Sequence, residues 1–299
     1  MRSRYTIPIV ASLTLTVGAV GAIGAGSLYS VADEARPSVR QFGYGEQPGN
    51  DLDLYLPAAV AVAKPGLMMT PTVVLVHGGS WTRGDKEDLA RQAEDLVEAG
   101  YVAISVNYRL APESPWPAQR NDLVTALKWI RSHALDLHVD ASRMVVLGSS
   151  AGGEVAAAAL TQGAGRKLAR GLITMSAPFD FGLIAQDTTL TDESAELAET
   201  VTRDLLGCVS DEVEECDADL EKRSVFNDVD PQDPPSLLFA SQRDWVDPQN
   251  SIRYHQVALS QDVDSRLVVF QGRRHGISYW RDAWPIVQEW LAARMTAPS

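Results

Sequence analysis

The sequence predicts an α/β protein built on a mostly parallel central sheet with helices on both faces. Short apolar runs rich in β-branched residues alternate with segments that carry apolar residues at helical spacing. Strands that alternate with helices pair in parallel, because each helix returns the chain to the same edge of the sheet. The 299 residues are 45% hydrophobic and 22% charged, which is typical of a globular protein. Without an N-terminal leader, roughly 265 residues suit one large domain or two small ones.

The first 32 residues are predicted to be a signal peptide or a signal anchor. Arg2 and Arg4 form a basic start, and no charged residue follows until after Ala32. The small residues Ser30 and Ala32 suit cleavage after Ala32, which favours export to a secreted or extracytoplasmic location. The uncharged stretch exceeds the about 7–15 apolar residues of a usual leader. An uncleaved segment that anchors the protein to the membrane is therefore the alternative.

Residues 33–49 are predicted to be a linker, and residues 50–299 to form the folded domain. Its first elements are an edge strand at 51–57, a buried strand at 72–77, a helix at 86–99, a buried strand at 101–107 and a helix at 121–133. The edge strand alternates polar and apolar residues, whereas the two buried strands are almost continuously apolar. Gly100 closes the first helix, because glycine readily adopts the left-handed backbone that ends many helices.

The second half of the domain continues the alternation around one interruption. The predicted elements are a strand at 144–147, a helix at 154–160, a strand at 171–175, a strand at 236–240, a helix at 249–259, a strand at 266–270 and a helix at 280–294. Residues 180–230 break the rhythm, because they are acidic, contain both cysteines and run into a proline-rich stretch. We expect them to form an insertion before the penultimate strand, over the active face of the domain.

The charge and the cysteines limit the partners of the protein. The net charge of −13 gives a surface that repels nucleic acid and anionic lipid. No nucleic-acid partner is therefore expected, and membrane contact is expected only through an uncleaved N-terminal anchor. Cys208 and Cys216 are predicted to form a disulfide, because export permits one, and two unpaired thiols are the alternative. Two cysteines with no histidine nearby do not predict a metal site.

The stretch Gly148-Ser149-Ser150-Ala151-Gly152 lies between a predicted strand and a predicted helix. It fits the pattern G-x-S-x-G, in which a sharp strand-to-helix turn strains the central residue and holds its side chain out. The flanking glycines leave room for the strand and the helix to pass closely. Ser150 is therefore predicted to be a nucleophile, with a plain turn residue as the alternative.

A serine hydroxyl is a weak nucleophile and needs a base and an orienting carboxylate. Of the five histidines, His275 alone follows a predicted strand on a glycine-flanked loop near the end of the chain. The carboxylate is expected between the serine and the histidine in the chain. Asp244 is the preferred candidate because it lies nearest the end of a strand, Asp247 is the second choice and Asp180 the third.

The run His77-Gly78-Gly79-Ser80-Trp81 follows a buried strand and is the fourth motif at a strand end. Attack on a carbonyl puts negative charge on its oxygen, and backbone N–H groups must already point there. Gly79 and Ser80, with Ala151 after the serine, are predicted to form this oxyanion hole. His77 and Gly78 would organise the loop. Trp81 is interpreted as a packing residue, and lining of the acyl pocket is the alternative.

With these motifs, the sequence resembles the α/β-hydrolase superfamily, in its carboxylesterase and feruloyl-esterase-like branch. The resemblance covers about residues 50–295 and is carried by HGGSWTRGDK, VNYRLAPESPWPAQRNDL, GSSAGG, DPPSLLFASQRDWVDPQNS and RRHGIS. It implies an α/β-hydrolase fold and a catalytic triad of Ser150, Asp244 and His275. The oxyanion hole of the family falls on Gly79, Ser80 and Ala151. Lipase-like relatives have a third glycine where this chain has Ser80, which implies a differently shaped acyl pocket.

The resemblance implies a serine hydrolase that cleaves small-molecule carboxylic esters through an acyl-enzyme, without a metal or an organic cofactor. Two alternatives remain open at this point. The first is an amidase resembling kynurenine formamidase, which shares a His-Gly-Gly-x-Trp loop, although export argues against it. The second is a non-catalytic binding protein on the same fold, which a missing triad member would indicate. No member of the triad is missing here.

Overall fold

The computed structural model describes residues 38–186, 192–207 and 224–296. All of these residues belong to one compact unit. The predicted leader at 1–32 and the predicted disulfide between Cys208 and Cys216 therefore lie outside the described residues. Among the described residues, no helix combines the length and the apolar character needed to cross a membrane.

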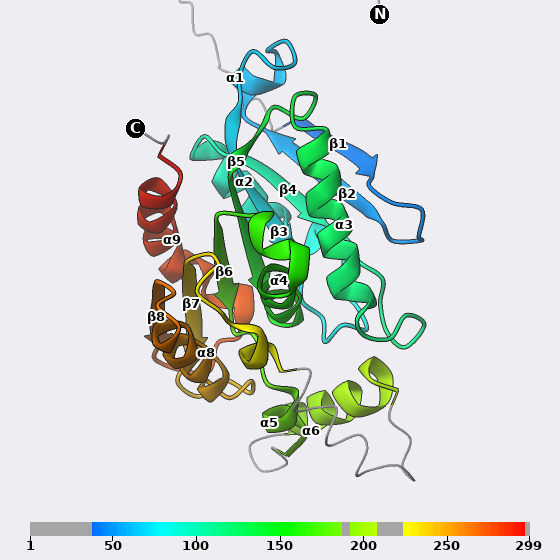
Figure 1. Cartoon of the computed structure of the whole chain (residues 1–299), viewed down its shortest axis with the longest axis vertical. Coiled ribbons are helices and arrows are strands. Elements are labelled where there is room, and N and C mark those ends of the chain that lie inside the picture. Colours follow the sequence, from blue (N-terminus) through cyan, green and yellow to red (C-terminus); the bar gives the residue numbers. More distant parts are fainter. Residues whose placement is uncertain (1–37, 187–191, 208–223, 297–299) are drawn as a thin grey trace, which may run out of the picture. The chain divides into compact units, whose positions relative to one another are not determined.

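The described strands form one eight-stranded sheet in the order β1-β2-β4-β3-β5-β6-β7-β8. They are β1 (Ser38–Gly43), β2 (Asp51–Leu56), β3 (Thr70–Val76), β4 (Val102–Val106), β5 (Val139–Ser149), β6 (Gly171–Met175), β7 (Ser236–Ser241) and β8 (Ser265–Phe270). β1 pairs antiparallel with β2, and β2 with β4, whereas all the other neighbours are parallel. The predicted mostly parallel sheet is confirmed, and the carboxyl ends of its parallel strands share one edge (Figure 1).

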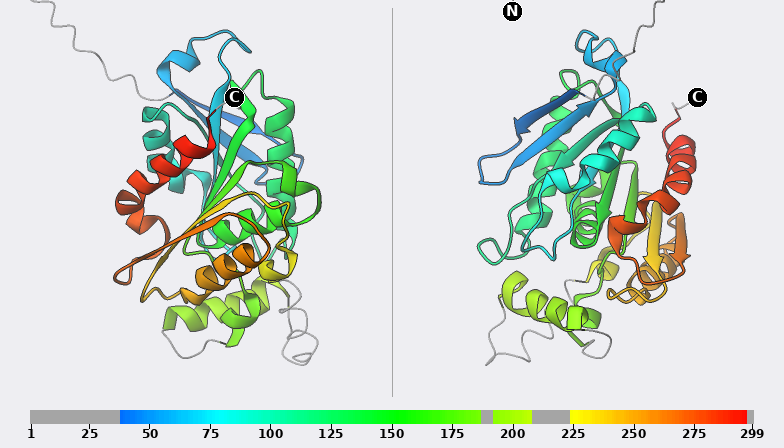
Figure 2. Two further views of the ribbon diagram at one scale, coloured as in Figure 1. Left: turned by 60° about the vertical axis from the view of Figure 1, so that its left-hand side comes forward. Right: turned by 180° about the vertical axis from the view of Figure 1, so that it is seen from behind.

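Helices cover both faces of this sheet, as Figure 2 shows from two sides. The described helices are α1 (Ala58–Ala61), α2 (Ala90–Glu98), α3 (Ala118–Ser132), α4 (Ala151–Thr161), α5 (Phe181–Gln186), α6 (Asp192–Glu199), α8 (Gln249–Ser260) and α9 (Trp280–Arg294). Alternate residues of a strand point to opposite faces. In β3, Val74 and Val76 pack in the core that contains α3, α4 and α8, whereas Val73 and Leu75 pack in the core of α2 and α9.

The first strand, β1, was not predicted and corrects the linker assigned to residues 33–49. Ser38–Gly43 pairs with β2 along its whole length and forms the outer edge of the sheet. Its side chains are mostly exposed, so the strand has no apolar run that could reveal it in the sequence. Its main contribution to the sheet is the row of backbone hydrogen bonds that covers β2.

The predicted insertion at 180–230 contains α5, α6, a π-helical turn at Thr200–Leu205 and a short 3₁₀ helix at Val225–Asp228. In Figure 1, α5 and α6 lie beyond the carboxyl ends of the strands. Phe181 of α5 packs edge-on against Trp81, with ring centroids 5.5 Å apart. Ser194 of α6 donates a hydrogen bond from Oγ to the carbonyl oxygen of Trp245, 3.1 Å away. The described part of the insertion therefore packs against the loops at this edge.

Candidate active site

The turn around Ser150 is a strained junction between β5 and α4. Ser150 has φ 53° and ψ −127°, a conformation that L-residues rarely adopt. Its N–H donates to the carbonyl oxygen of Met175 at 2.8 Å, which fixes the turn to the next strand. A Cβ atom on Gly148 would lie 2.2 Å from the Gly152 oxygen, and one on Gly152 would lie 2.2 Å from the His77 oxygen. The two glycines are therefore required by the close approach of strand, helix and loop.

Three side chains predicted from distant parts of the sequence meet at this turn. His275 Nε2 lies 2.8 Å from Ser150 Oγ, and His275 Nδ1 lies 2.8 Å from Asp244 Oδ1. The Asp244 side chain is 1% exposed and that of His275 is 19% exposed. The carboxylate is therefore withdrawn from water, and the partly exposed imidazole lies between it and the serine.

The alternative carboxylates are engaged elsewhere. Asp247 Oδ1 accepts a hydrogen bond from the backbone N–H of Gln249 at the start of α8. Asp180 forms an ion pair with Arg253, with Oδ2 2.7 Å from its Nη1. Of the three aspartates considered, only Asp244 contacts His275. The structure therefore places the preferred candidate, and neither alternative, beside the base.

The predicted oxyanion loop has an unusual backbone. Gly79, Ser80 and Trp81 have positive φ angles of 111°, 51° and 60° in succession. Within the described part of the chain, the backbone N–H groups of Gly79, Ser80 and Ala151 donate no hydrogen bond. Gly79 and Ser80 line the same cavity of about 480 Å³ as Ser150 and His275. The Gly79 and Ser80 donors are therefore available to a ligand at the serine.

His77 holds this loop from behind and is placed to organise it, as predicted. Its ring stacks on Tyr108 with centroids 4.3 Å apart, and the Tyr108 hydroxyl donates to the His77 carbonyl oxygen. Nδ1 lies 2.8 Å from the carbonyl oxygen of Gly78, which can only accept, so this nitrogen carries the proton. Burial lowers the pKa of His77, because an imidazolium would lose its hydration. A neutral ring that fixes Gly78 supports the loop.

Trp81 is not among the residues that line the cavity beside Ser150, which favours the packing interpretation over the alternative that it lines the acyl pocket. The side chain is fully buried and packs against Phe181. Its indole Nε1–H donates to Glu154 Oε2 at 3.0 Å. The buried ring and its contact with Phe181 fit the packing interpretation.

Glu154 is a buried carboxyl that the sequence reasoning treated only as part of a helix. It lies in the first turn of α4, four residues after Ser150, and is fully buried. Burial raises the pKa of Glu154 to about 8, against a smaller opposing effect of the Trp81 hydrogen bond. The signal that could have found it is a single acid at the head of the apolar run VAAAAL.

Replacement of Glu154 by glutamine should change how stability depends on pH. Because the folded-state pKa is raised, the folded protein holds a proton that the unfolded chain releases above pH of about 4.5. The free energy of unfolding therefore falls as pH rises towards 8, and Glu154→Gln removes this loss. We expect the variant to gain on the order of 1–4 kcal/mol relative to wild type between pH 5 and pH 8.

Urea unfolding at pH 5, 6.5 and 8 measures this difference, with the exposed Glu98→Gln as the matched control. All titrating groups other than Glu154 are common to the wild type and Glu154→Gln and cancel in their difference. A difference between Glu154→Gln and wild type that stays constant over this range would show that Glu154 does not titrate in this way.

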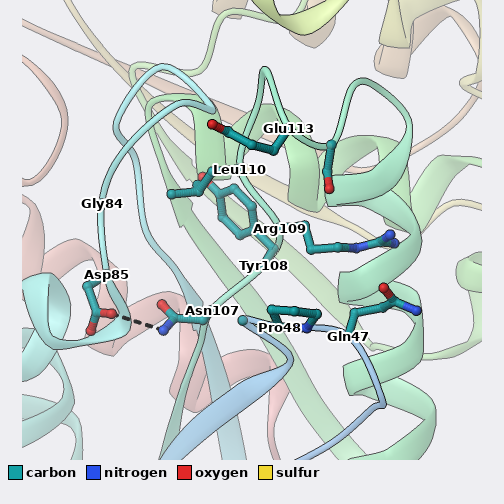
Figure 3. A pocket seen from close by; sticks show the side chains of 11 residues that line it. Gln47, Pro48, Gly84, Asp85, Asn107, Tyr108, Arg109, Leu110 and Glu113 are labelled. Atoms are coloured by element: carbon teal, nitrogen blue, oxygen red, sulfur yellow. Dashed lines mark hydrogen bonds between the residues drawn. The ribbon is translucent and has the colours of Figure 1, made fainter.

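A second cavity of about 530 Å³ lies at the same edge of the sheet (Figure 3). Tyr108 and Arg109 line it, and Arg109 is held by Asp122 through Nε and Nη2 at 2.8 and 2.7 Å. None of the predicted catalytic or oxyanion residues lines this cavity, although Gly84 borders both cavities. The catalytic candidates therefore concentrate in the cavity that contains Ser150.

Parts of the chain match curated proteins. The carboxylesterase NlhH of Mycobacterium tuberculosis is 45% identical over 89 residues, which are 29% of this chain and 28% of that protein. The arylacetamide deacetylase of Oryctolagus cuniculus is 42% identical over 94 residues, which are 29% of this chain and 23% of that protein. The matches thus span less than a third of these curated relatives.

Solved structures extend the likeness to most of the chain. A bacterial heroin esterase superposes with a TM-score of 0.70 at 21% identity, over 90% of this chain and 87% of that one. The carboxylesterase EstE1 from a metagenomic library gives 0.68 at 21% identity, over 88% and 90%. The predicted α/β-hydrolase fold is confirmed by these likenesses. Because the family model BD-FAE matches residues 52–257, more than half of the sequence, the chain belongs to the BD-FAE family.

Proposed function

We propose that this protein is a serine carboxylesterase that cleaves small-molecule esters. The observation that carries the proposal is the unbroken hydrogen-bonded series Asp244–His275–Ser150 at a strained strand-to-helix turn. A buried carboxylate, an imidazole and a hydroxyl in this geometry are the parts of a serine nucleophile. Several relatives matched over part of the chain are named as esterases, which supports the same reaction class.

The proposed reaction begins when Ser150 Oγ attacks the ester carbonyl carbon as His275 Nε2 takes the hydroxyl proton. The negative charge that develops on the carbonyl oxygen is stabilised by the N–H groups of Gly79, Ser80 and Ala151. His275 then gives its proton to the leaving alcohol, and an acyl group remains on Ser150. Water, deprotonated by His275, attacks this acyl-enzyme and releases the acid. Asp244 holds the imidazole in the required tautomer throughout.

A panel of nitrophenyl esters from acetyl to octanoyl tests this proposal on the purified, chelator-treated full chain. We expect turnover with short acyl groups, which fit the cavity of about 480 Å³ beside Ser150. Trp245 also lines this cavity, with its ring centroid 4.1 Å from that of His275. The matching nitroanilides measure the amidase alternative in the same assay. Absence of turnover on every ester would contradict the esterase, and faster cleavage of the anilides would favour the amidase.

We also propose export of the chain, on the basis of the basic start and small residues of its first 32 positions. The mass of the protein recovered outside the cytoplasm distinguishes cleavage after Ala32 from an uncleaved anchor. A count of reactive thiols in the same sample tests the proposed disulfide between Cys208 and Cys216.

A further inference from the structure

Ser176 is a buried serine with a strained backbone at the end of β6. Its φ is 54°, a value that favours glycine, and the residue is 2% exposed. Its N–H donates to the Phe239 carbonyl oxygen of β7 at 2.8 Å. Glycine would meet the backbone requirement at lower cost, so the serine side chain must contribute something that glycine cannot.

The Ser176 hydroxyl contacts three groups, and two of them belong to the proposed catalytic machinery. Ser176 Oγ lies 2.5 Å from Asp244 Oδ2, the carboxylate oxygen that does not face His275. The backbone N–H of Gly276, next to His275, donates to the same Oγ at 3.1 Å. The hydroxyl of Tyr279 lies 2.9 Å from it. One hydroxyl therefore joins the acid and the loop that carries the base.

The donors and acceptors at this hydroxyl balance. An ionised carboxylate can only accept, so the single proton of Ser176 goes to Asp244 Oδ2. The lone pairs of Ser176 then accept from the Gly276 N–H and face the Tyr279 hydroxyl, whose single proton is shared between Ser176 Oγ and the Phe239 carbonyl oxygen at 3.2 Å. Asp244 Oδ1 is left for the His275 Nδ1–H, with a weaker contribution from the Val246 N–H at 3.3 Å. Without Ser176, a buried carboxylate oxygen would lose this partner, which is costly in a side chain that is 1% exposed.

We propose that Ser176 is a positioning residue. It fixes the rotation of the Asp244 carboxylate and, through Gly276, the position of the loop that carries His275. This inference rests on the proposed function, because it assigns a partner to the proposed acid and base. A carboxylate held at both oxygens cannot rotate away from the imidazole. A loop held at Gly276 cannot withdraw His275 from Ser150. The proposed triad is thus extended by a fourth side chain, from the residue that follows β6.

Two variants separate the hydroxyl from the backbone. Ser176→Ala removes the hydroxyl and keeps the strain, whereas Ser176→Gly removes the hydroxyl and relieves the strain. The matched control is Ser241→Ala. Ser241 also carries a buried hydroxyl at a strand end, three residues before Asp244, and its Oγ has no hydrogen-bond partner among the described residues.

Steady-state kinetics with a nitrophenyl ester and proton NMR of the full chain are the two measurements. We expect both Ser176 variants to lower kcat about 10–100-fold with KM within about twofold, as removal of a supporting hydrogen bond does in other sites. The far-downfield proton resonance of His275 Nδ1–H, bonded to Asp244, should broaden or disappear in both. Ser241→Ala should retain the wild-type kcat and resonance. Thermal unfolding of each variant checks that it is folded at the temperature of the kinetic assay.

The outcomes distinguish this inference from the proposed function. If the wild type hydrolyses esters and both Ser176 variants match Ser241→Ala, the inference is wrong. Recovery of activity in Ser176→Gly alone would also overturn it, because backbone strain would then be the cause. If the wild type cleaves no ester, the proposed function fails, and the downfield resonance still decides whether Ser176 holds Asp244 against His275.

Discussion

Ser150→Ala should lower kcat for ester hydrolysis by about ten thousand-fold or more, with little change in the binding of substrate. In the proposed mechanism, the hydroxyl oxygen at 2.8 Å from His275 Nε2 bonds to the acyl carbon, and an alanine methyl group cannot replace it. Only the predicted oxyanion donors and the cavity remain, and these supply a small fraction of the rate enhancement. The loop and helix at this turn are fixed by glycines and backbone bonds, so the fold should survive.

His275→Ala should match the serine variant, and the double variant should be no slower than either single one. Such non-additivity is expected of a nucleophile and base that act as a unit. His255→Ala is the control, because His255 lies in α8 and contacts Ser265 Oγ through Nδ1, away from Ser150. Burst kinetics with a nitrophenyl ester measure the acylation step in the wild type and in these four variants. An acylation rate in Ser150→Ala equal to that of the wild type would contradict the proposed mechanism.

The parts of the site that the sequence predicted share one property. Ser150, Asp244 and His275 each follow a strand whose apolar run is plain in the sequence, and parallel strands place their carboxyl ends at one edge. The motif order Ser, Asp, His then follows the order of the strands. Proximity in space was therefore deducible from topology before any distance was known.

The parts that were missed depend on contacts that no local pattern contains. Ser176 meets Asp244 and Gly276 from 68 and 100 residues away, and nothing in the run MSAPFD marks its hydroxyl. In the sequence Glu154 resembles an ordinary helix residue, and only the structure shows that it is buried and accepts a hydrogen bond from Trp81 Nε1–H. β1 carries no buried apolar face, so its place at the edge comes from backbone pairing alone. Tertiary contacts and edge pairing thus account for these differences.

Asp244→Asn should lower kcat by about a thousand- to ten thousand-fold, whereas Asp247→Asn should leave it within about twofold of wild type. In the wild type, Asp244 Oδ1 accepts the proton on His275 Nδ1 and leaves Nε2 free to take the proton of Ser150. An asparagine that presents its NH₂ group to Nδ1 favours the tautomer with the proton on Nε2, which cannot act as a base. Asp247 instead accepts a hydrogen bond from the Gln249 N–H at the start of α8, a role that asparagine fills equally well.

The two variants carry the same chemical change three residues apart, so a general loss of negative charge would affect both alike. Single-turnover acylation rates, with the folded fraction checked by thermal unfolding, measure the difference. A larger loss in Asp247→Asn than in Asp244→Asn would move the acid to Asp247 and would require the loop after β7 to rearrange when substrate binds.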